Sequence, residues 1–208
     1  MLMDRTKKSA TESRATGEKK EVPKGVAKKE GKKAMTYLDC FSGIGGFAKG
    51  IIQASSQATC VGFSEIDKYA IQTYEHNFPT HTNYGDITKI DTATLPDFDC
   101  FVGGFPCPSW SISGKRKGFE DERGELFFDI VRILKVKQPP LFVLENVKGL
   151  LSHDKGNSME RICEELCAIG YALDFDVLNS KNFGVPQSRE RVFIIGKRLD
   201  TLSEKDII

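Results

Sequence analysis

The chain has 208 residues and a formal net charge of +1, a length sufficient for one domain with a sizeable hydrophobic core. No apolar run approaches the length of about 20 residues needed to cross a bilayer, and the N-terminus lacks the apolar stretch of a secretory signal. Composition therefore argues against a membrane-spanning or secreted protein, and no membrane partner is expected.

The charge is divided unequally along the chain. Residues 1–34 carry eleven basic residues against five acidic ones, a net charge of +6, whereas residues 35–208 have a net charge of −5. Residues 1–34 also contain no aromatic residue, so they cannot bury enough apolar surface to offset the entropy of ordering. We therefore predict a disordered basic N-terminal tail over residues 1–34 and a folded domain over residues 35–208. A solvated extension is the simplest role for this tail, and contact with DNA phosphates is the alternative.

The cysteines lack the paired spacing of a disulfide-rich secreted fold, so we expect reduced thiols and a cytoplasmic protein. They are Cys40, Cys60, Cys100, Cys107, Cys163 and Cys167. No metal site is predicted, because the three histidines are scattered and supply no second ligand pair beside Cys163 and Cys167.

Hydrophobic periodicity and turn residues predict strands that alternate with helices. In chain order we expect a strand over Thr36–Phe41, a helix over Phe47–Ala54, a strand over Thr59–Ser64, a helix over Lys68–Asn77 and a strand over Cys100–Gly103. Then follow a helix over Glu125–Lys137, a strand over Leu141–Leu144, a helix from Met159 to Ile169, and strands over Tyr171–Leu178 and Val192–Lys197. This alternation predicts an α/β fold with a mostly parallel sheet and helices on both of its faces.

A glycine-rich turn, Ser42-Gly43-Ile44-Gly45-Gly46, follows the first strand and opens the first helix. Glycines let the backbone approach a ligand closely, and the helix N-terminus offers free N–H groups. The turn is therefore a candidate site for a dinucleotide or for S-adenosylmethionine. The alternative is a tight turn without a ligand.

Two carboxylates follow at positions where a nucleoside would need them. Glu65 ends the second strand, where an acidic residue can accept hydrogen bonds from both ribose hydroxyls. Asp86 is expected at the edge of a third strand, near an adenine amino group. Exposed carboxylates at strand ends are common, so each signal is weak by itself.

Gly103-Gly104-Phe105-Pro106-Cys107 presents one thiol at the carboxyl end of a strand, the edge where open α/β sheets bind their ligands. Cys107 is a candidate nucleophile, and a small buried hydrophobic residue is the alternative. The polar loop from Pro108 to Arg123 follows it. Small and basic residues in this loop suit phosphate contact and closure over a substrate, whereas a solvated surface loop is the alternative. The candidates are Ser111, Ser113, Lys115 and Arg116.

Glu145 and Asn146 follow the predicted strand Leu141–Leu144, and a carboxyl group at that edge can exchange a proton with a ring nitrogen. Arg189 and Arg191 are two apart in an extended segment, so both guanidinium groups face the same way and suit a phosphate or a base carbonyl oxygen. For Glu145 and Asn146 the alternative is a helix-capping pair, and for the two arginines it is a structural ion pair with Glu190 or a neighbour.

These motifs, taken in order, resemble the blocks of the DNA (cytosine-5) methyltransferase family. The resemblance extends from about Thr36 to Lys197, and it includes Arg123-Gly124-Glu125-Leu126-Phe127-Phe128-Asp129. It implies a Rossmann-like S-adenosylmethionine-dependent methyltransferase fold, S-adenosylmethionine as cofactor, and double-stranded DNA as partner. It also implies methylation of ring carbon 5 of a flipped cytosine, in the cytoplasm of a bacterial or phage-infected cell, at the nucleoid.

The resemblance also implies roles for individual residues. The cofactor loop is formed by Phe41, Gly43, Gly45 and Gly46, the ribose carboxylate is Glu65, and the adenine is bound by Ile66, Asp86 and Ile87. The nucleophile is Cys107, positioned by Pro106, and the acid at the cytosine ring nitrogen is Glu145. The loop that carries Cys107 is ordered by Asn146, and the target base and this loop are held by Arg189 and Arg191.

Two departures from the family pattern limit the resemblance. Pro108 follows Cys107 where many family members have glutamine. In the family, a target-recognition domain and a final helix follow the block that ends near Lys197, so we expect a second polypeptide to carry the recognition part. The alternatives are an inactive remnant, a non-catalytic module that binds DNA or a partner through the basic tail, and RNA cytosine methylation. The joint presence of Cys107, Glu145, Arg189 and Arg191 argues against long decay.

Overall fold

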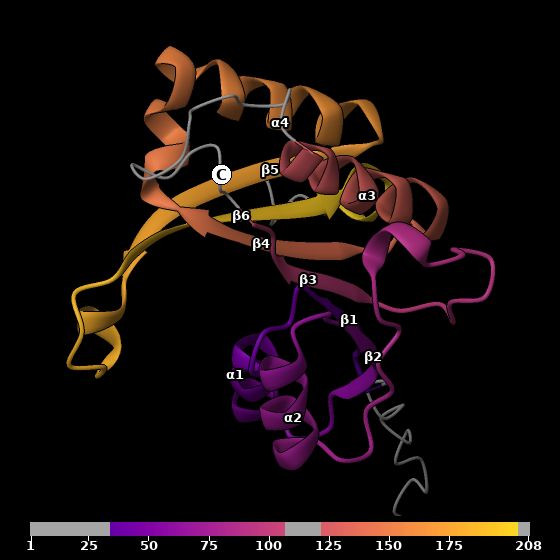
Figure 1. The fold of residues 1–208 in the computed structure, drawn as a ribbon. Helices are drawn as coiled ribbons and strands as arrows, with labels where there is room; N and C mark the ends of the chain where they lie inside the picture. The colour runs from indigo at the N-terminus through magenta and orange to yellow at the C-terminus, as the bar shows by residue number, and fades with distance from the viewer. Residues whose placement is uncertain (1–33, 107–121, 204–208) are drawn as a thin grey trace, which may run out of the picture. The chain divides into compact units, whose positions relative to one another are not determined.

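The computed structural model describes residues 34–106 and 122–203, and the side chains of the second range are described from residue 126 onward (Figure 1). Residues 1–33 of the predicted tail, Cys107 and the predicted loop candidates Ser111, Ser113, Lys115 and Arg116 lie outside the described residues.

The described residues form a six-stranded sheet in the order β2-β1-β3-β4-β6-β5. Its parallel part consists of β1 (Thr36–Cys40), β2 (Thr59–Ser64), β3 (Cys100–Gly104) and β4 (Leu141–Val147). β6 (Glu190–Arg198) runs antiparallel to β4, and β5 (Tyr171–Asn179) runs antiparallel to β6. The predicted mostly parallel sheet is confirmed.

Four α-helices in the described ranges cover both faces of this sheet. α1 (Gly46–Ala54) and α2 (Lys68–Asn77) lie on one face, and α3 (Glu122–Lys137) and α4 (Asn157–Ala168) lie on the other (Figure 1). Short 3-10 turns occupy Ile87–Lys89, Lys148–Gly156, Ser180–Phe183 and Leu199–Thr201. No helix in residues 34–106 and 122–203 has the length and apolar character needed to cross a bilayer.

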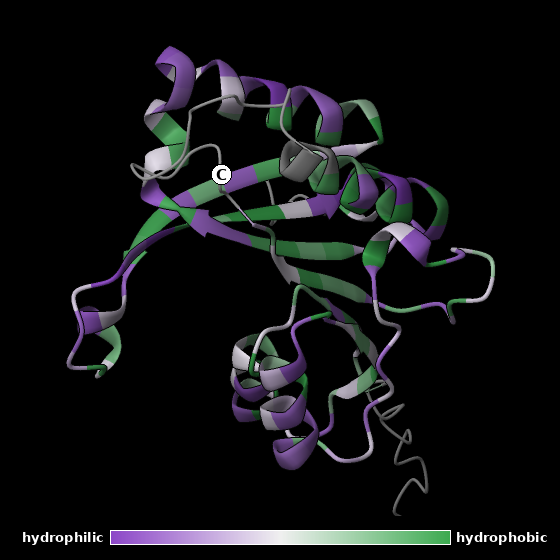
Figure 2. Cartoon of the chain, viewed as in Figure 1, coloured by the Kyte–Doolittle hydropathy of each residue, from purple (hydrophilic) through white to green (hydrophobic). Residues whose placement is uncertain are grey.

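Alternate residues of each central strand enter two separate hydrophobic cores, one on each face of the sheet. Leu38 and Phe101 pack in the core beneath α3 and α4, together with Phe142. Tyr37 and Val102 pack in the core beneath α1 and α2. Figure 2 shows hydrophobic residues along the central strands and hydrophilic ones on the outer sides of the helices. Burial on both faces accounts for the apolar runs Cys100–Val102 in β3 and Leu141–Leu144 in β4.

The structure differs from the sequence predictions at three places near the site residues. β4 continues to Val147 because its pairing with β6 continues to Val147 and Arg191, so Glu145 and Asn146 lie within the strand instead of after it. By the same pairing, Arg191 lies inside β6. Asp86 does not sit at the edge of a further strand: it caps the 3-10 turn Ile87–Lys89, and this segment pairs with β2 at the single bridge Phe63–Asn83.

Gly196 in β6 provides a test of this packing. A Cβ at Gly196 would lie 2.0 Å from the ring of Phe142, which is fully buried. Gly196→Ala should therefore lower the free energy of unfolding by about 1–3 kcal/mol through overpacking, measured as a lower urea midpoint with an unchanged m-value.

Gly50→Ala is the matched control for this substitution. Gly50 is exposed within α1, and a Cβ there would meet nothing within 4 Å. This change should raise the free energy of unfolding by up to about 1 kcal/mol, since alanine is the better helix former. Equal stability of the Gly196→Ala protein and the unchanged protein would contradict the packing.

Candidate functional site

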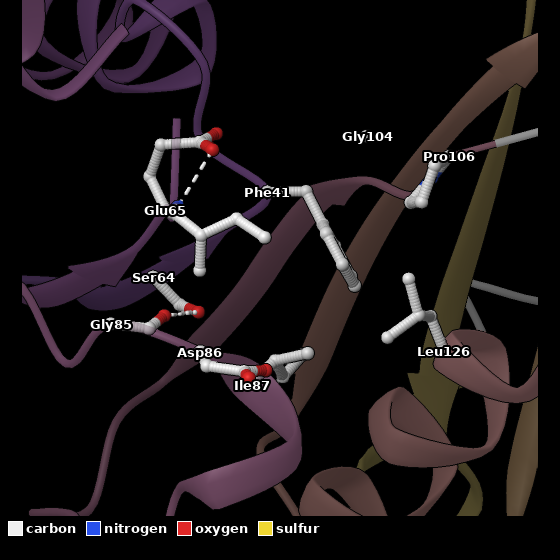
Figure 3. Close-up of a pocket in the computed structure, with 10 residues that line it drawn as sticks. Phe41, Ser64, Glu65, Gly85, Asp86, Ile87, Gly104, Pro106 and Leu126 are labelled. Atoms are coloured by element: carbon white, nitrogen blue, oxygen red, sulfur yellow. Dashed lines mark hydrogen bonds between the residues drawn. The ribbon is translucent and has the colours of Figure 1, made fainter. Parts of the chain in front are cut away.

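A cavity of about 330 Å³ opens at the carboxyl ends of β1, β2 and β3 (Figure 3). Parallel strands present their carboxyl ends at one edge, so loops that are distant in sequence meet there. This first cavity is lined by Phe41, Ser64, Glu65, Ile66, Gly85, Asp86, Ile87, Gly104, Pro106 and Leu126.

The turn after β1 needs left-handed backbone at three positions. Phe41 has φ 52°, Gly43 has φ 54° and Gly45 has φ 94°. Gly45 also has no room for a side chain, because a Cβ would lie 2.6 Å from the ring of Phe78. Left-handed backbone is costly for Phe41, and such strain is typical of functional sites. This conformation directs the Phe41 ring into the cavity (Figure 3).

Three backbone N–H groups hold the carboxylate of Glu65. Oε2 accepts a hydrogen bond from the N–H of Gly43 at 2.8 Å, and Oε1 accepts from those of Ile66 at 2.8 Å and Asp67 at 2.9 Å. The first bond ties the end of β2 to the glycine-rich turn. A carboxylate has about four acceptor positions, so Glu65 can still accept from a ligand hydroxyl.

Asp86 and Ile87 are fixed from two sides. Oδ1 of Asp86 accepts from the hydroxyl of Thr88 at 2.8 Å and from its N–H at 3.0 Å, and these bonds lower the pKa of Asp86. From α3, the guanidinium of Arg132 donates to the carbonyl of Ile87 and to that of Ile90, each at 2.8 Å. The segment is therefore held with an ionised carboxylate at the cavity wall.

A second cavity, of about 280 Å³, lies beside Glu145 and is lined by Glu145, Leu178, Ser180, Phe183, Arg189, Arg191 and Phe193. Oε1 of Glu145 lies 2.9 Å from Nε of Arg191 and 3.9 Å from a terminal nitrogen of Arg189. The two arginines thus face the same carboxylate. Glu190 instead pairs with Lys148 at 3.0 Å, so the carboxylate that both arginines face is that of Glu145 and not that of Glu190.

Gly104 adjoins both cavities. It lines the first cavity, and a Cβ on Gly104 would lie 3.2 Å from Oε2 of Glu145 in the wall of the second. The missing side chain leaves room for the Glu145 carboxylate between them.

Asn146 holds the chain just before Cys107. It is buried, and its Nδ2 donates to the carbonyl of Phe105 at 3.2 Å. Its Oδ1 accepts from the N–H of Val147 at 2.8 Å. The position of the Phe105–Pro106 peptide is thereby tied to β4.

The structure brings most of the predicted site residues in its described part to two adjacent cavities. Gly43, Gly45 and Gly46 shape the turn without lining the first cavity. Sequence reasoning did not select four residues that line it, namely Ser64, Gly85, Gly104 and Leu126. Gly85 and Gly104 stand next to predicted residues, whereas Leu126 is part of an apolar helix stripe and gave no separate signal. In the described ranges, no group of three or more His, Cys, Asp or Glu side chains could hold a metal ion.

Comparison with known proteins assigns the family. Residues 35–207 match the model of the C-5 cytosine-specific DNA methylases. The chain belongs to this family. It is 51% identical over 174 residues to the orphan methyltransferase M.Rho11sI of Bacillus phage rho11s, a match that covers 83% of this chain and 35% of that protein. It is 45% identical over 166 residues to the type II methyltransferase M.HhaI of Haemophilus parahaemolyticus, covering 80% and 50%.

Solved structures show the same methylase fold. A putative DNA modification methyltransferase encoded within an E. coli prophage superposes with a TM-score of 0.67 at 25% identity, covering 83% of this chain and 50% of that one. The S. pombe Dnmt2 methyltransferase also gives a TM-score of 0.67, at 24% identity, covering 81% and 52%. The chain spans between about a third and a half of the length of the curated relatives above.

A buried acid lies beneath the glycine-rich turn of this methylase domain. Asp39 is fully buried in β1, and neither of its carboxylate oxygens has a hydrogen bond of normal geometry within the described residues. Burial raises the pKa of Asp39 from 3.8 to about 8, and the backbone N–H of Ala48 offsets only part of this effect. This raised pKa favours the protonated form of Asp39 at neutral pH.

The buried proton on Asp39 predicts a pH dependence of stability. Between pH 3.8 and about 8 the folded protein retains a proton that the unfolded chain has released. Its contribution is therefore full below pH 3.8 and is lost as the pH rises to about 8, with a slope of at most about 1.4 kcal/mol per pH unit. Asp39→Asn should remove this slope, which urea unfolding at pH 5, 6, 7 and 8 would measure. Parallel pH profiles for the two proteins would contradict a protonated Asp39.

Proposed function

We propose that this chain is the catalytic part of a DNA (cytosine-5) methyltransferase, which transfers a methyl group from S-adenosylmethionine to ring carbon 5 of cytosine. The observation that carries the proposal is the closeness of Gly104, which lines one cavity, to the carboxylate of Glu145, which lines the other. One is lined by two carboxylates and by apolar side chains, and the other has a carboxylate paired with Arg191. Cys107 follows Pro106, which lines the first cavity.

The first cavity suits S-adenosylmethionine by the chemistry of its walls. Glu65 accepts hydrogen bonds from the ribose hydroxyls, and Asp86 accepts from the adenine amino group. Ile66 is 73% exposed at the rim, which leaves its side chain free to pack on the adenine. When bound, S-adenosylmethionine supplies an electrophilic methyl group.

The second cavity suits the cytosine. The Cys107 thiolate adds its electron pair to ring carbon 6, which turns the ring into an enamine and makes carbon 5 nucleophilic. A proton from Glu145 at the ring nitrogen and the charge of Arg191 near the carbonyl oxygen stabilise the charge that develops. After carbon 5 has taken the methyl group, loss of its proton returns the electron pair to the ring and expels the Cys107 thiolate.

DNA is the proposed substrate, and the target base must leave the stack, because carbon 6 is not accessible to a thiolate inside a duplex. We propose that DNA sequence is recognised by a second polypeptide. The chain spans about a third to a half of the length of its relatives. The place of action is then the bacterial or phage-infected cytoplasm, where this DNA resides.

Covalent trapping tests this function in the chain alone. A duplex carries 5-fluorocytosine opposite a mismatched base, which lowers the cost of base flipping and reduces the need for a recognition part. Because fluorine cannot leave as a cation, the chain should stay bonded to the DNA through Cys107 when S-adenosylmethionine is present. Mass spectrometry of the adduct is the measurement.

Two variants sharpen this experiment. Cys107→Ala should abolish the adduct yet retain S-adenosylmethionine binding, because Cys107 lies outside the glycine-rich turn. Cys167→Ala is the matched control, since Cys167 is an exposed cysteine of α4 that is distant in sequence from Cys107 and from the glycine-rich turn. This variant should form as much adduct as the unchanged chain. Failure of a cofactor-binding chain to form any adduct would contradict the catalytic proposal. An adduct with RNA that carries 5-fluorocytosine, and none with DNA, would contradict the choice of polymer.

A further inference from the structure

Asn83 lies where the segment after α2 meets the end of β2. The N–H of Phe63 donates to the carbonyl of Thr82 at 2.9 Å, and the N–H of Tyr84 donates to the carbonyl of Phe63 at 2.7 Å. These two bonds form a single parallel bridge, and no ladder of backbone bonds continues from it in the described residues. Beyond the bridge, backbone groups on both sides need other partners.

The side chain of Asn83 supplies these partners. Its Oδ1 accepts from the N–H of Gly85 at 2.8 Å and from the N–H of Glu65 at 3.3 Å. Its Nδ2 donates to the carbonyl of Glu65 at 3.2 Å. One amide group is therefore hydrogen-bonded to the N–H and the carbonyl of Glu65 and to the N–H of Gly85, which precedes Asp86.

These bonds link three segments of the first cavity. Asn83 fixes the backbone of Glu65, and the carboxylate of Glu65 in turn accepts from the N–H of Gly43 in the glycine-rich turn. The hydroxyl of Ser64 adds a second tie by donating to the carbonyl of Gly85 at 2.6 Å. Asn83 does not itself line the cavity, so it acts on a ligand through its neighbours.

We propose that Asn83 is a positioning residue, which sets the Glu65 carboxylate to accept from the ribose hydroxyls of an adenosine-containing ligand. This inference rests on the proposed cofactor. The planar amide of asparagine donates to the carbonyl of Glu65 while accepting from its N–H, which an ionised aspartate of the same size cannot do, and this accounts for asparagine at this position. Without it, the Glu65 peptide rotates and the carboxylate loses its fixed direction.

Isothermal titration of the whole chain with S-adenosylhomocysteine tests the inference. Asn83→Ala should weaken this ligand about tenfold, since the hydrogen bonds of its ribose to a charged acceptor are lost. The analogue that lacks both ribose hydroxyls should bind the variant and the unchanged chain equally. In a Glu65→Ala background, Asn83→Ala should have no further effect on S-adenosylhomocysteine, because coupled residues are not additive.

Two further proteins serve as controls. Asn77→Ala removes an exposed asparagine whose amide donates to the carbonyl of Thr73 within α2, at 2.8 Å, and it should leave both affinities unchanged. Asn83→Asp keeps the shape and both acceptor bonds but loses the donor to Glu65, so it should weaken S-adenosylhomocysteine even if Asn83→Ala does not fold.

The outcomes separate the two proposals. If the unchanged chain fails to bind S-adenosylhomocysteine, the proposed cofactor and this inference are both overturned. If it binds and the Asn83 variants bind equally well, the inference alone is overturned. Equal weakening of the ligands with and without ribose hydroxyls would mean a general loosening of the domain, and that also overturns it.

Discussion

The parallel register of β1, β3 and β4 is the constraint on which the rest of the site depends. Cys40 pairs with Gly103, Gly103 pairs with Leu144, and Gly104 pairs with Glu145. β1 therefore ends at the level of Leu144 and β3 at the level of Glu145, and β4 continues beyond them to Val147. The glycine-rich turn, the Gly-Gly-Phe-Pro segment and Glu145 meet at one edge. A slip of one residue would turn every side chain of a strand to the other face, and burial on both faces prevents it.

The residues at this edge are unfavourable for stability by themselves. Phe41 adopts left-handed backbone, Asp39 is buried with no hydrogen bond of normal geometry to the residues that the structure describes, and Gly104 contributes no side chain to the core. The two hydrophobic cores hold these features in place from both faces of the sheet. Such features persist where the surrounding structure determines them, and two of these residues, Phe41 and Gly104, line the first cavity.

Local pattern was sufficient to place the elements in the described part of the chain, because alternation and helical periodicity are set by which faces are buried. The strand Thr59–Ser64 and the helix Lys68–Asn77 have the bounds that the sequence predicts. The end of β4 was not predictable in this way, since it depends on antiparallel pairing with β6, which is distant in sequence. Leu126 and Ser64 line the first cavity, but the sequence did not mark them as functional. An apolar helix residue or a serine at a strand end has the same sequence pattern whether it lies in the core or in a cavity wall.

The sequence by itself determined the fold class, the family blocks and most of the predicted residues at the two cavities. It could do so because each block is a short segment that contains both the turn residues and the functional side chains. Only the tertiary structure decided how those residues meet. The pairing of Arg191 with Glu145, the bonds of Asn83 to Glu65 and Gly85, and the room that Gly104 leaves for Glu145 join segments far apart in the chain. Those contacts follow from strand order and register, which long-range packing fixes and local sequence does not encode.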